Sequence, residues 1–183
     1  MSDPIELDPV TRITAAATGE PGQRTFYLQA RDETTLVSLL LEKQQVAMLS
    51  LHVDELLDRI GRAPDADDPH VPDPSSLDLE EPVSPAFRVG QIGLGYDEAR
   101  DLVLLQCEEY VPEEEEEAAE PVVTDPGQVR LWATRAQVYA LARRGEREVA
   151  AGRPTCRMCG EPLEPEGHFC PRSNGHRQVT ELS

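Results

Sequence analysis

The last thirty residues contain the part of this sequence whose chemistry can be named. Three cysteines and two histidines fall there, at Cys156, Cys159, His168, Cys170 and His176. Zn²⁺ at a structural site takes four Cys or His ligands in a closed tetrahedron, and a Cys-x2-Cys turn that ends in glycine presents two thiolates together. The spacing therefore predicts a structural zinc site, with Cys156 and Cys159 on one side and Cys170 on the other.

The fourth zinc ligand is open between the two histidines. His168 lies two residues before Cys170, and in an extended segment residues i and i+2 point to the same side, so both could reach one metal. His176 would instead close a second loop, for which Asn174-Gly175 supplies a turn. We favour His168 because it needs no particular loop geometry, and His176 stays the alternative.

A catalytic role for this zinc is less favoured than a structural one. A catalytic site keeps one metal position for water and has a proton-transferring group nearby. Glu161, Glu164 and Glu166 are close in sequence, but they lie in a proline-rich turn where carboxylates more often face solvent. The ligands also come from one short segment, which is typical of a closed structural site. We predict no catalytic residues.

Composition and charge restrict the partners. The chain has 183 residues, 39% of them hydrophobic, which is enough for one real core with a small metal-held appendage. Its formal net charge of −18 repels phosphate backbones and anionic membrane surfaces, so binding to nucleic acid or membrane is disfavoured.

The expected compartment is the cytoplasm. The sequence has neither an apolar run long enough to span a membrane nor an N-terminal signal pattern. In a reducing compartment the three clustered cysteines indicate a metal site rather than disulfides. Cys107 lies in an apolar strand pattern, and we expect it to be a packed core thiol.

Two acidic segments lack the apolar residues needed to fold. Residues 63–85 combine six prolines with many aspartates, and residues 112–126 contain five consecutive glutamates at 113–117. Like charges at such density repel each other and extend the backbone. We expect both segments to be solvated loops. The alternative is that they dock a basic partner.

The rest of the chain shows the same order of elements twice. Strand patterns followed by a helical pattern are expected at 12–19, 24–30, 34–41 and about 46–60. The order returns at 87–94, 101–110, 129–133 and about 135–151. Five pairs of similar residues share one offset: Leu39 with Leu131, Lys43 with Arg135, Gln45 with Gln137, Val46 with Val138, and Leu49 with Leu141.

These patterns predict an α+β fold made of two internally duplicated βββα units. A three-stranded sheet with one helix buries too little alone, but two units can join into one antiparallel sheet with both helices on a common face. The expected organisation is a body at 1–152 and a zinc-ribbon tail at 153–183. Within the body, repeat one spans 10–62, the acidic linker 63–85, and repeat two 86–152 with its acidic loop at 112–126.

The whole pattern resembles an uncharacterised actinobacterial family of conserved hypothetical proteins. The resemblance is carried by the paired βββα order, the acidic interruptions and a tail with Cys156-x-x-Cys159-Gly160 and Gly167-His168-x-Cys170-Pro171. It implies that the gene has two companions, for a phosphatidylinositol-kinase-like protein and a phosphoglycerate-mutase-like phosphatase. It implies no catalytic residue.

Two functions from different classes are compatible with these features. The first is a non-enzymatic interaction or adaptor module with a structural zinc site, whose protein partner is a kinase-like or phosphatase-like companion. The second is an enzyme or a binding protein for a small molecule or anion, with its site between the two repeats. Lys43 and Arg135, at equivalent repeat positions, are the candidate anion-binding residues, accompanied by Arg31 and Arg130.

Overall fold

The computed structural model describes residues 4–61, 63–65, 67–112, 126–152, 156–160, 163, 168–173 and 178–179. The chain begins with β1 (Ile5–Leu7), β2 (Arg12–Thr18), β3 (Thr25–Arg31), β4 (Leu36–Leu41) and α1 (Lys43–Arg59). It continues with η1 (Pro74–Ser76), β5 (Pro85–Asp97), β6 (Leu102–Glu109), β7 (Gln128–Thr134) and α2 (Arg135–Ala150). The last elements are β8 (His168–Phe169), η2 (Pro171–Ser173) and β9 (Gln178–Val179). Among the described residues, no helix has the length and apolar character needed to cross a membrane.

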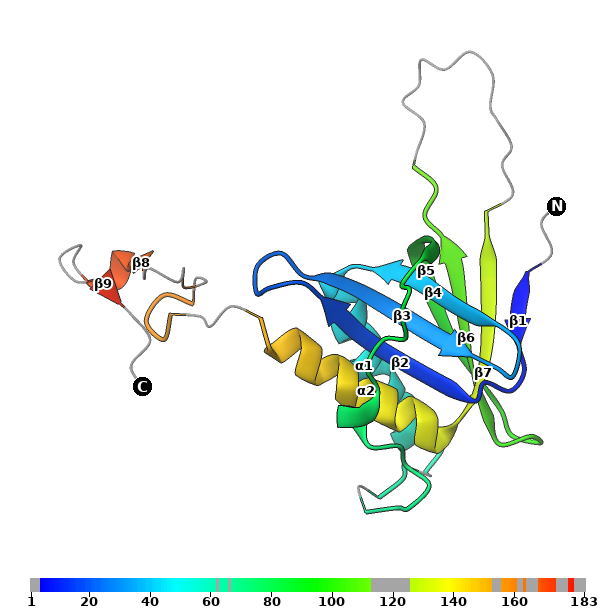
Figure 1. The fold of residues 1–183 in the computed structure, drawn as a ribbon. Coiled ribbons are helices and arrows are strands. Elements are labelled where there is room, and N and C mark those ends of the chain that lie inside the picture. The colour runs from blue at the N-terminus through cyan, green and yellow to red at the C-terminus, as the bar shows by residue number, and fades with distance from the viewer. Residues whose placement is uncertain are drawn as a thin grey trace, which may run out of the picture.

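Seven strands form one sheet in the order β1-β7-β6-β5-β4-β3-β2, and both helices lie against the same face of it (Figure 1). The expectation of an entirely antiparallel sheet is wrong, because β4 pairs with β5, and β1 with β7, in parallel. A crossover connection returns the chain to the same end of a sheet and so joins parallel strands. Helix α1 and the segment that follows it form this crossover between β4 and β5.

The core lies between the sheet and the two helices. In β6 the buried residues Val103, Leu105 and Cys107 alternate with partly exposed ones, which is the period of a strand with one face in the core. Each helix contributes one buried stripe to the same core, with Val46, Leu49, Val53 and Leu57 from α1, and Val138, Leu141 and Ala142 from α2. The predicted strands and helices are therefore present close to their expected positions.

The two helices begin in the same way. The residue before each helix, Glu42 or Thr134, donates its backbone N–H to the side chain of the third helical residue, Gln45 or Gln137. Each glutamine then donates its amide to a backbone carbonyl outside its own unit, since Gln45 Nε2 lies 2.9 Å from the Val89 oxygen. Gln137 Nε2 lies 3.1 Å from the Val10 oxygen in the same manner. The internal duplication itself stays a prediction.

The two ends of the strand order are joined by the chain between β1 and β2. Val10 donates its N–H to the Trp132 carbonyl in β7, and Thr11 donates to the Arg31 carbonyl in β3, both at 2.8 Å. Consecutive residues thus bond to strands that stand far apart in the sheet order. The sheet curls until its β7 and β3 sides meet along this connection.

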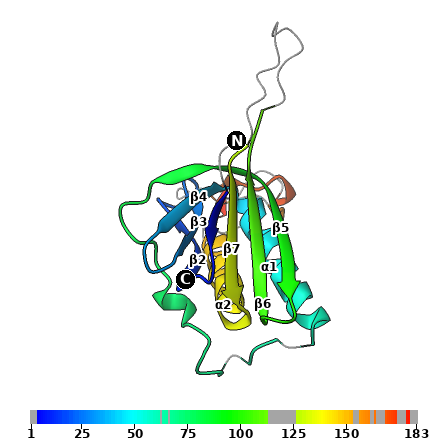
Figure 2. The same ribbon diagram turned by 90° about the vertical axis from the view of Figure 1, so that its right-hand side faces the viewer.

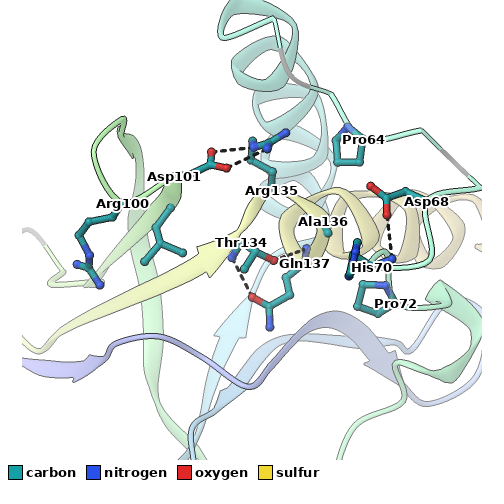
Figure 3. Close-up of a pocket in the computed structure, with 11 residues that line it drawn as sticks. Pro64, Asp68, His70, Pro72, Arg100, Asp101, Thr134, Arg135, Ala136 and Gln137 are labelled. Atoms are coloured by element: carbon teal, nitrogen blue, oxygen red, sulfur yellow. Dashed lines mark hydrogen bonds and ion pairs between the residues drawn. The ribbon is translucent and has the colours of Figure 1, made fainter.

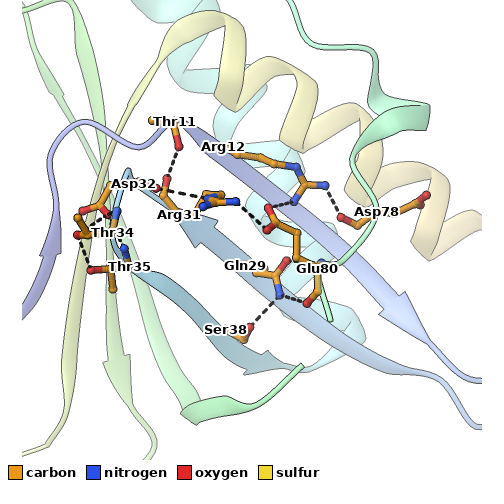
Figure 4. A network of polar contacts seen from close by, with 10 residues as sticks. All are labelled: Thr11, Arg12, Gln29, Arg31, Asp32, Thr34, Thr35, Ser38, Asp78 and Glu80. Carbon is orange, nitrogen blue, oxygen red and sulfur yellow. Dashed lines mark hydrogen bonds and ion pairs between the residues drawn. The ribbon is translucent and has the colours of Figure 1, made fainter. Parts of the chain in front are cut away.

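The expectation that residues 63–85 form only a solvated loop is wrong for their second part. Leu77 is buried, and its carbonyl accepts a hydrogen bond of 2.6 Å from the buried Thr14 hydroxyl. Glu80 exchanges two hydrogen bonds with the buried Gln29 side chain, of 2.7 Å from its N–H and 3.0 Å to its carbonyl (Figure 4). We call residues 77–80 the strap.

The strap is ordered by polar side chains on the outer face of the first three-stranded unit. The Glu80 carboxylate pairs with Arg31 at 3.0 Å and with Arg12 at 3.5 Å. These side chains pair with the charge and the backbone groups of the strap. The few apolar residues within the strap gave no indication that it would be ordered. In the second acidic segment, residues 113–125 lie outside the described residues.

Candidate metal centre

A tight turn brings the first two cysteines of the tail together. The Gly160 N–H donates to the Cys156 carbonyl at 2.8 Å, which closes the turn around Cys159. Gly160 has φ of +79°, a conformation that residues with a side chain rarely adopt. The glycine after the Cys-x2-Cys pair therefore has a direct conformational role.

Cys170 reaches the same place from the other side of the ribbon. It follows β8, which pairs with β9 in an antiparallel hairpin. The sulfur atoms of Cys156, Cys159 and Cys170 all lie within 4.8 Å of one another. A tetrahedral Zn²⁺ with Zn–S bonds of about 2.3 Å holds its sulfurs about 3.8 Å apart, so this cluster could hold a metal ion.

The cluster has a small apolar surrounding of its own. Cys170 is 0% exposed and Cys156 2%, and Leu163 packs beside them, whereas Cys159 is half-buried. Arg172 Nη1 donates to the Met158 carbonyl at 3.2 Å and so ties η2 to the Cys-x2-Cys turn. Two of the three thiols are thus shielded from water, which suits a structural site better than one that admits substrate.

The structure does not decide the fourth ligand. The backbone of His168 pairs with Val179 in the β8–β9 hairpin, but its side chain lies outside what the structure describes. His176 also lies outside the described residues. Both histidines therefore stay predictions as ligands.

The fourth cysteine is separate from this cluster. Cys107 belongs to β6 and is 0% exposed in the core, as its apolar sequence context predicts. Burial raises the pKa of its thiol from 9.0 to about 12, because the thiolate would lose its solvation. Cys107 is consequently protonated at neutral pH and has no features of a nucleophile or a metal ligand.

Arg135, a candidate anion-binding residue, holds an acid of its own chain. Its Nε and Nη2 donate to the two Asp101 carboxylate oxygens at 2.8 and 2.9 Å, and this hydrogen bonding raises the pKa of Arg135. Tyr96 also donates its hydroxyl to Asp101, at 2.7 Å. Asp101 has φ of +53°, which is uncommon for a residue with a side chain.

Arg135 lines a pocket of about 590 Å³ at the start of α2 (Figure 3). Pro64, Asp68, His70 and Pro72 form one wall of it, and the turn before β6 forms another. Its polar lining residues are Asp68, His70, Arg100, Asp101, Thr134, Arg135 and Gln137. Lys43, at the start of the other helix, is not among the lining residues, so a joint role of Lys43 and Arg135 in anion binding stays a prediction.

A second pocket, which the sequence interpretation missed, lies between α1 and β5. It measures about 300 Å³, and its apolar lining comes from Met48, Leu49, Ile92 and Leu94. The sequence did contain a signal, because Met48 falls outside the apolar stripe expected for α1. In the structure Met48 is 47% exposed.

Comparison with known proteins gives a family but no function. No curated protein and no solved structure matches the chain. One family model, described as a protein of unknown function, matches residues 5–170, which include most of the body and all three clustered cysteines. The chain therefore belongs to this family of proteins of unknown function, DUF3090.

Proposed function

We propose that the protein is a non-enzymatic interaction module whose C-terminal ribbon is held together by a structural Zn²⁺. The observation that carries this proposal is the convergence of the Cys156, Cys159 and Cys170 sulfurs from two sides of the ribbon. Thiolate-rich sites select zinc over the hard cations that prefer oxygen ligands. Among the described residues of the ribbon, the apolar cluster holds only Leu163 besides the three cysteines, so metal binding would supply much of the folding free energy of the ribbon.

The proposed ligand set is Cys156, Cys159, Cys170 and His168, with His176 as the alternative fourth ligand. Three thiolates and one neutral imidazole would leave a single negative charge on a Zn²⁺ centre. Arg157 and Arg172 flank the thiols and would moderate this charge. Partial exposure of Cys159 makes it the most accessible of the three thiols to chelators or oxidants.

The body would act as the rigid support of this ribbon. We propose that residues 1–152 arose by duplication of a βββα unit and that residues 153–183 form a separate tail. The equivalent glutamines Gln45 and Gln137 support the duplication, because each one caps its helix and bonds a backbone carbonyl of the other unit through the same pair of hydrogen bonds.

The chemistry of the partner follows from charge. A chain with a net charge of −18 favours a basic protein partner and disfavours nucleic acid and anionic membranes. The actinobacterial resemblance adds a kinase-like or phosphatase-like companion as the candidate partner. A cytoplasmic location agrees with thiols that are used for metal rather than for disulfides.

Metal content tests this proposal directly. We expect one zinc per native chain by inductively coupled plasma mass spectrometry after dialysis against a mild chelator, and no zinc in Cys159→Ser. The matched control is Cys107→Ala, which removes a buried thiol outside the cluster and should keep the full zinc content. Native protein without metal, or Cys159→Ser with a full equivalent, would overturn the metal centre.

Binding of a small polar molecule is a second candidate function, favoured by the pocket of about 590 Å³ beside Asp101. Left-handed backbone at a residue with a side chain concentrates at functional sites, and Asp101 is held there by Tyr96 and Arg135. We expect millimolar inorganic phosphate to raise the melting temperature of the native chain but not of Arg135→Gln. Lys43→Gln tests the joint role of the two basic residues, and an unchanged native melting temperature would contradict this function.

A further inference from the structure

One edge of β5 has no strand beside it. Strand β4 pairs with β5 only at Ser38 with Pro85 and at Leu40 with Arg88, and then ends at Leu41. Strand β5 continues to Asp97 with β6 on its other side. Among the described residues, 91–95 therefore have no neighbouring strand on the side away from β6 (Figure 2).

The free edge begins after the hydrogen bonds that Gln45 of α1 makes to β5. Gln45 Nε2 donates to the Val89 carbonyl at 2.9 Å and to the Gly90 carbonyl at 3.4 Å, which caps the edge up to residue 90. Beyond this point the pocket of about 300 Å³ separates α1 from β5. Met48 from α1 and Ile92 from β5 both line it, so an apolar groove runs beside the free edge.

The corresponding strand in the other half has its helix packed closely against it. Helix α2 approaches β2 so closely that a Cβ on Gly145 would lie 3.7 Å from the Ala15 Cβ. Arg24, next to β3, donates to the Glu148 carbonyl of α2 at 2.6 Å and pairs with the Glu148 carboxylate. Helix α2 therefore packs closely on β2, whereas a groove remains between α1 and β5.

Two glycines on this stretch of β5 are not required by the fold. A Cβ on Gly93 would have its nearest neighbour at 3.9 Å and one on Gly95 at 3.7 Å, which are ordinary contacts. At Gly90, by contrast, a Cβ would meet the Tyr110 Cα at 3.0 Å, so only this glycine relieves crowding beside the bulge. Glycine weakens a strand, and where packing does not explain it, it marks the close approach of another backbone.

We propose that an extended segment of a partner protein adds as a strand to residues 91–95 of β5. Alternate backbone groups along a free edge pair with an incoming strand, and every second side chain of that strand would enter the groove beside Met48. The net charge of −18 selects a segment with basic residues between its apolar ones and disfavours a second copy of this chain. The inference rests on the proposed interaction role and names its surface, but it does not depend on the metal.

A displayed library of random ten-residue peptides is the probe for this edge. We expect selection on the native chain to enrich peptides that alternate apolar and basic residues. Their affinity should fall about tenfold or more for Met48→Glu, a loss of at least about 1.4 kcal/mol. Leu51→Glu is the matched control, because Leu51 is 50% exposed on the same helix but does not line the groove, and it should change affinity less than about twofold.

The geometry of binding is tested with the enriched peptides themselves. N-methylation of alternate peptide amides should abolish binding on one of the two alternations, and binding should slow amide hydrogen exchange at alternate positions within 91–95. The proposal is overturned if no peptide is enriched, if Met48→Glu binds equally well, or if both N-methylated forms still bind. A dimer of the native chain that Met48→Glu separates would assign the edge to a second copy and would also overturn it.

The Cys159→Ser chain separates this inference from the metal centre. We expect it to bind the enriched peptides as the native chain does, because the groove belongs to the body. Peptide binding without any zinc in the native chain would contradict the metal centre alone. Zinc bound normally without any enriched peptide would contradict the strand addition alone.

Discussion

Gln45 and Gln137 perform the same structural task in the two halves of the molecule. The side-chain oxygen of Gln45 accepts from the Glu42 N–H at 2.8 Å, and that of Gln137 accepts from the Thr134 N–H at 2.9 Å. Each amide nitrogen then reaches a backbone carbonyl of the other unit, at Val89 in β5 or at Val10 in the connection between β1 and β2. One side chain therefore both begins the helix and attaches it to the other unit.

This equivalence predicts that substitution of either glutamine lowers the free energy of unfolding by the same amount. Gln45→Ala and Gln137→Ala should each lower the free energy of unfolding by about 1–2 kcal/mol, because each removes a helix-capping bond and a bond to the carbonyl of a buried residue. Urea unfolding followed by circular dichroism measures this. Gln44→Ala, at an exposed neighbouring position, should stay within about 0.5 kcal/mol of the native chain. A loss in only one of the two glutamine variants would argue against equivalent roles.

Gly145 should tolerate no side chain, because it lies where the two helices touch. A Cβ there would lie 2.8 Å from the Ser50 Oγ and 3.0 Å from the Val46 Cγ1. Gly145→Ala should lower the free energy of unfolding by about 1–3 kcal/mol, although alanine favours a helix by about 1 kcal/mol. Gly93→Ala, where the added Cβ would make only ordinary contacts, should be neutral or stabilise by less than about 1 kcal/mol in the same urea experiment. A stable Gly145→Ala chain would contradict the close helix packing.

The strap should depend on one buried hydroxyl. Thr14→Val leaves the Leu77 carbonyl without its donor and should lower the free energy of unfolding by about 1–3 kcal/mol. It should also speed proteolysis within residues 63–80. Thr11→Val is the control, since the Thr11 hydroxyl bonds the Arg31 carbonyl at an exposed site. Equal proteolysis rates in the two variants would show that the strap is not held through Thr14.

Cys107 should make stability depend on alkaline pH. Its folded pKa of about 12 lies above the value of 9.0 for an ordinary thiol, so the folded state keeps its proton where the unfolded state loses it. The stabilisation is complete below about pH 9 and is lost as the pH rises towards 12. The stability of native protein should therefore fall more steeply over this range than that of Cys107→Ala. Parallel pH profiles, measured by urea unfolding, would contradict a buried neutral thiol.

Most local structure was accessible from the sequence, and the long-range pairing was not. The alternation in β6 and the apolar stripe of α1 are periodic, so their type and position followed from spacing. The parallel pairing of β4 with β5 depends on the path of a crossover. Strand β1 has only three residues, which is too short for periodicity to identify.

The strap and the groove were missed for physical reasons. The sequence near Leu77 is rich in acids and prolines, which are typical of an unfolded segment. The strap is held in place by Thr14 and Gln29, which precede their partners by more than fifty residues. The groove arises because α1 and β5 diverge where α2 and β2 pack closely. In the metal centre, by contrast, the turn at Cys156 and Cys159 is local, so its spacing predicted the cluster that Cys170 completes.

X-ray absorption at the zinc edge of the purified native chain tests the proposed zinc site. We expect a first shell of three sulfurs at about 2.3 Å and one nitrogen at about 2.0 Å. His168→Ala should remove the nitrogen from the first shell if His168 is the fourth ligand. His176→Ala should remove it if His176 is the fourth ligand. A zinc shell without sulfur, or a chain that carries no zinc, would contradict the proposed zinc site.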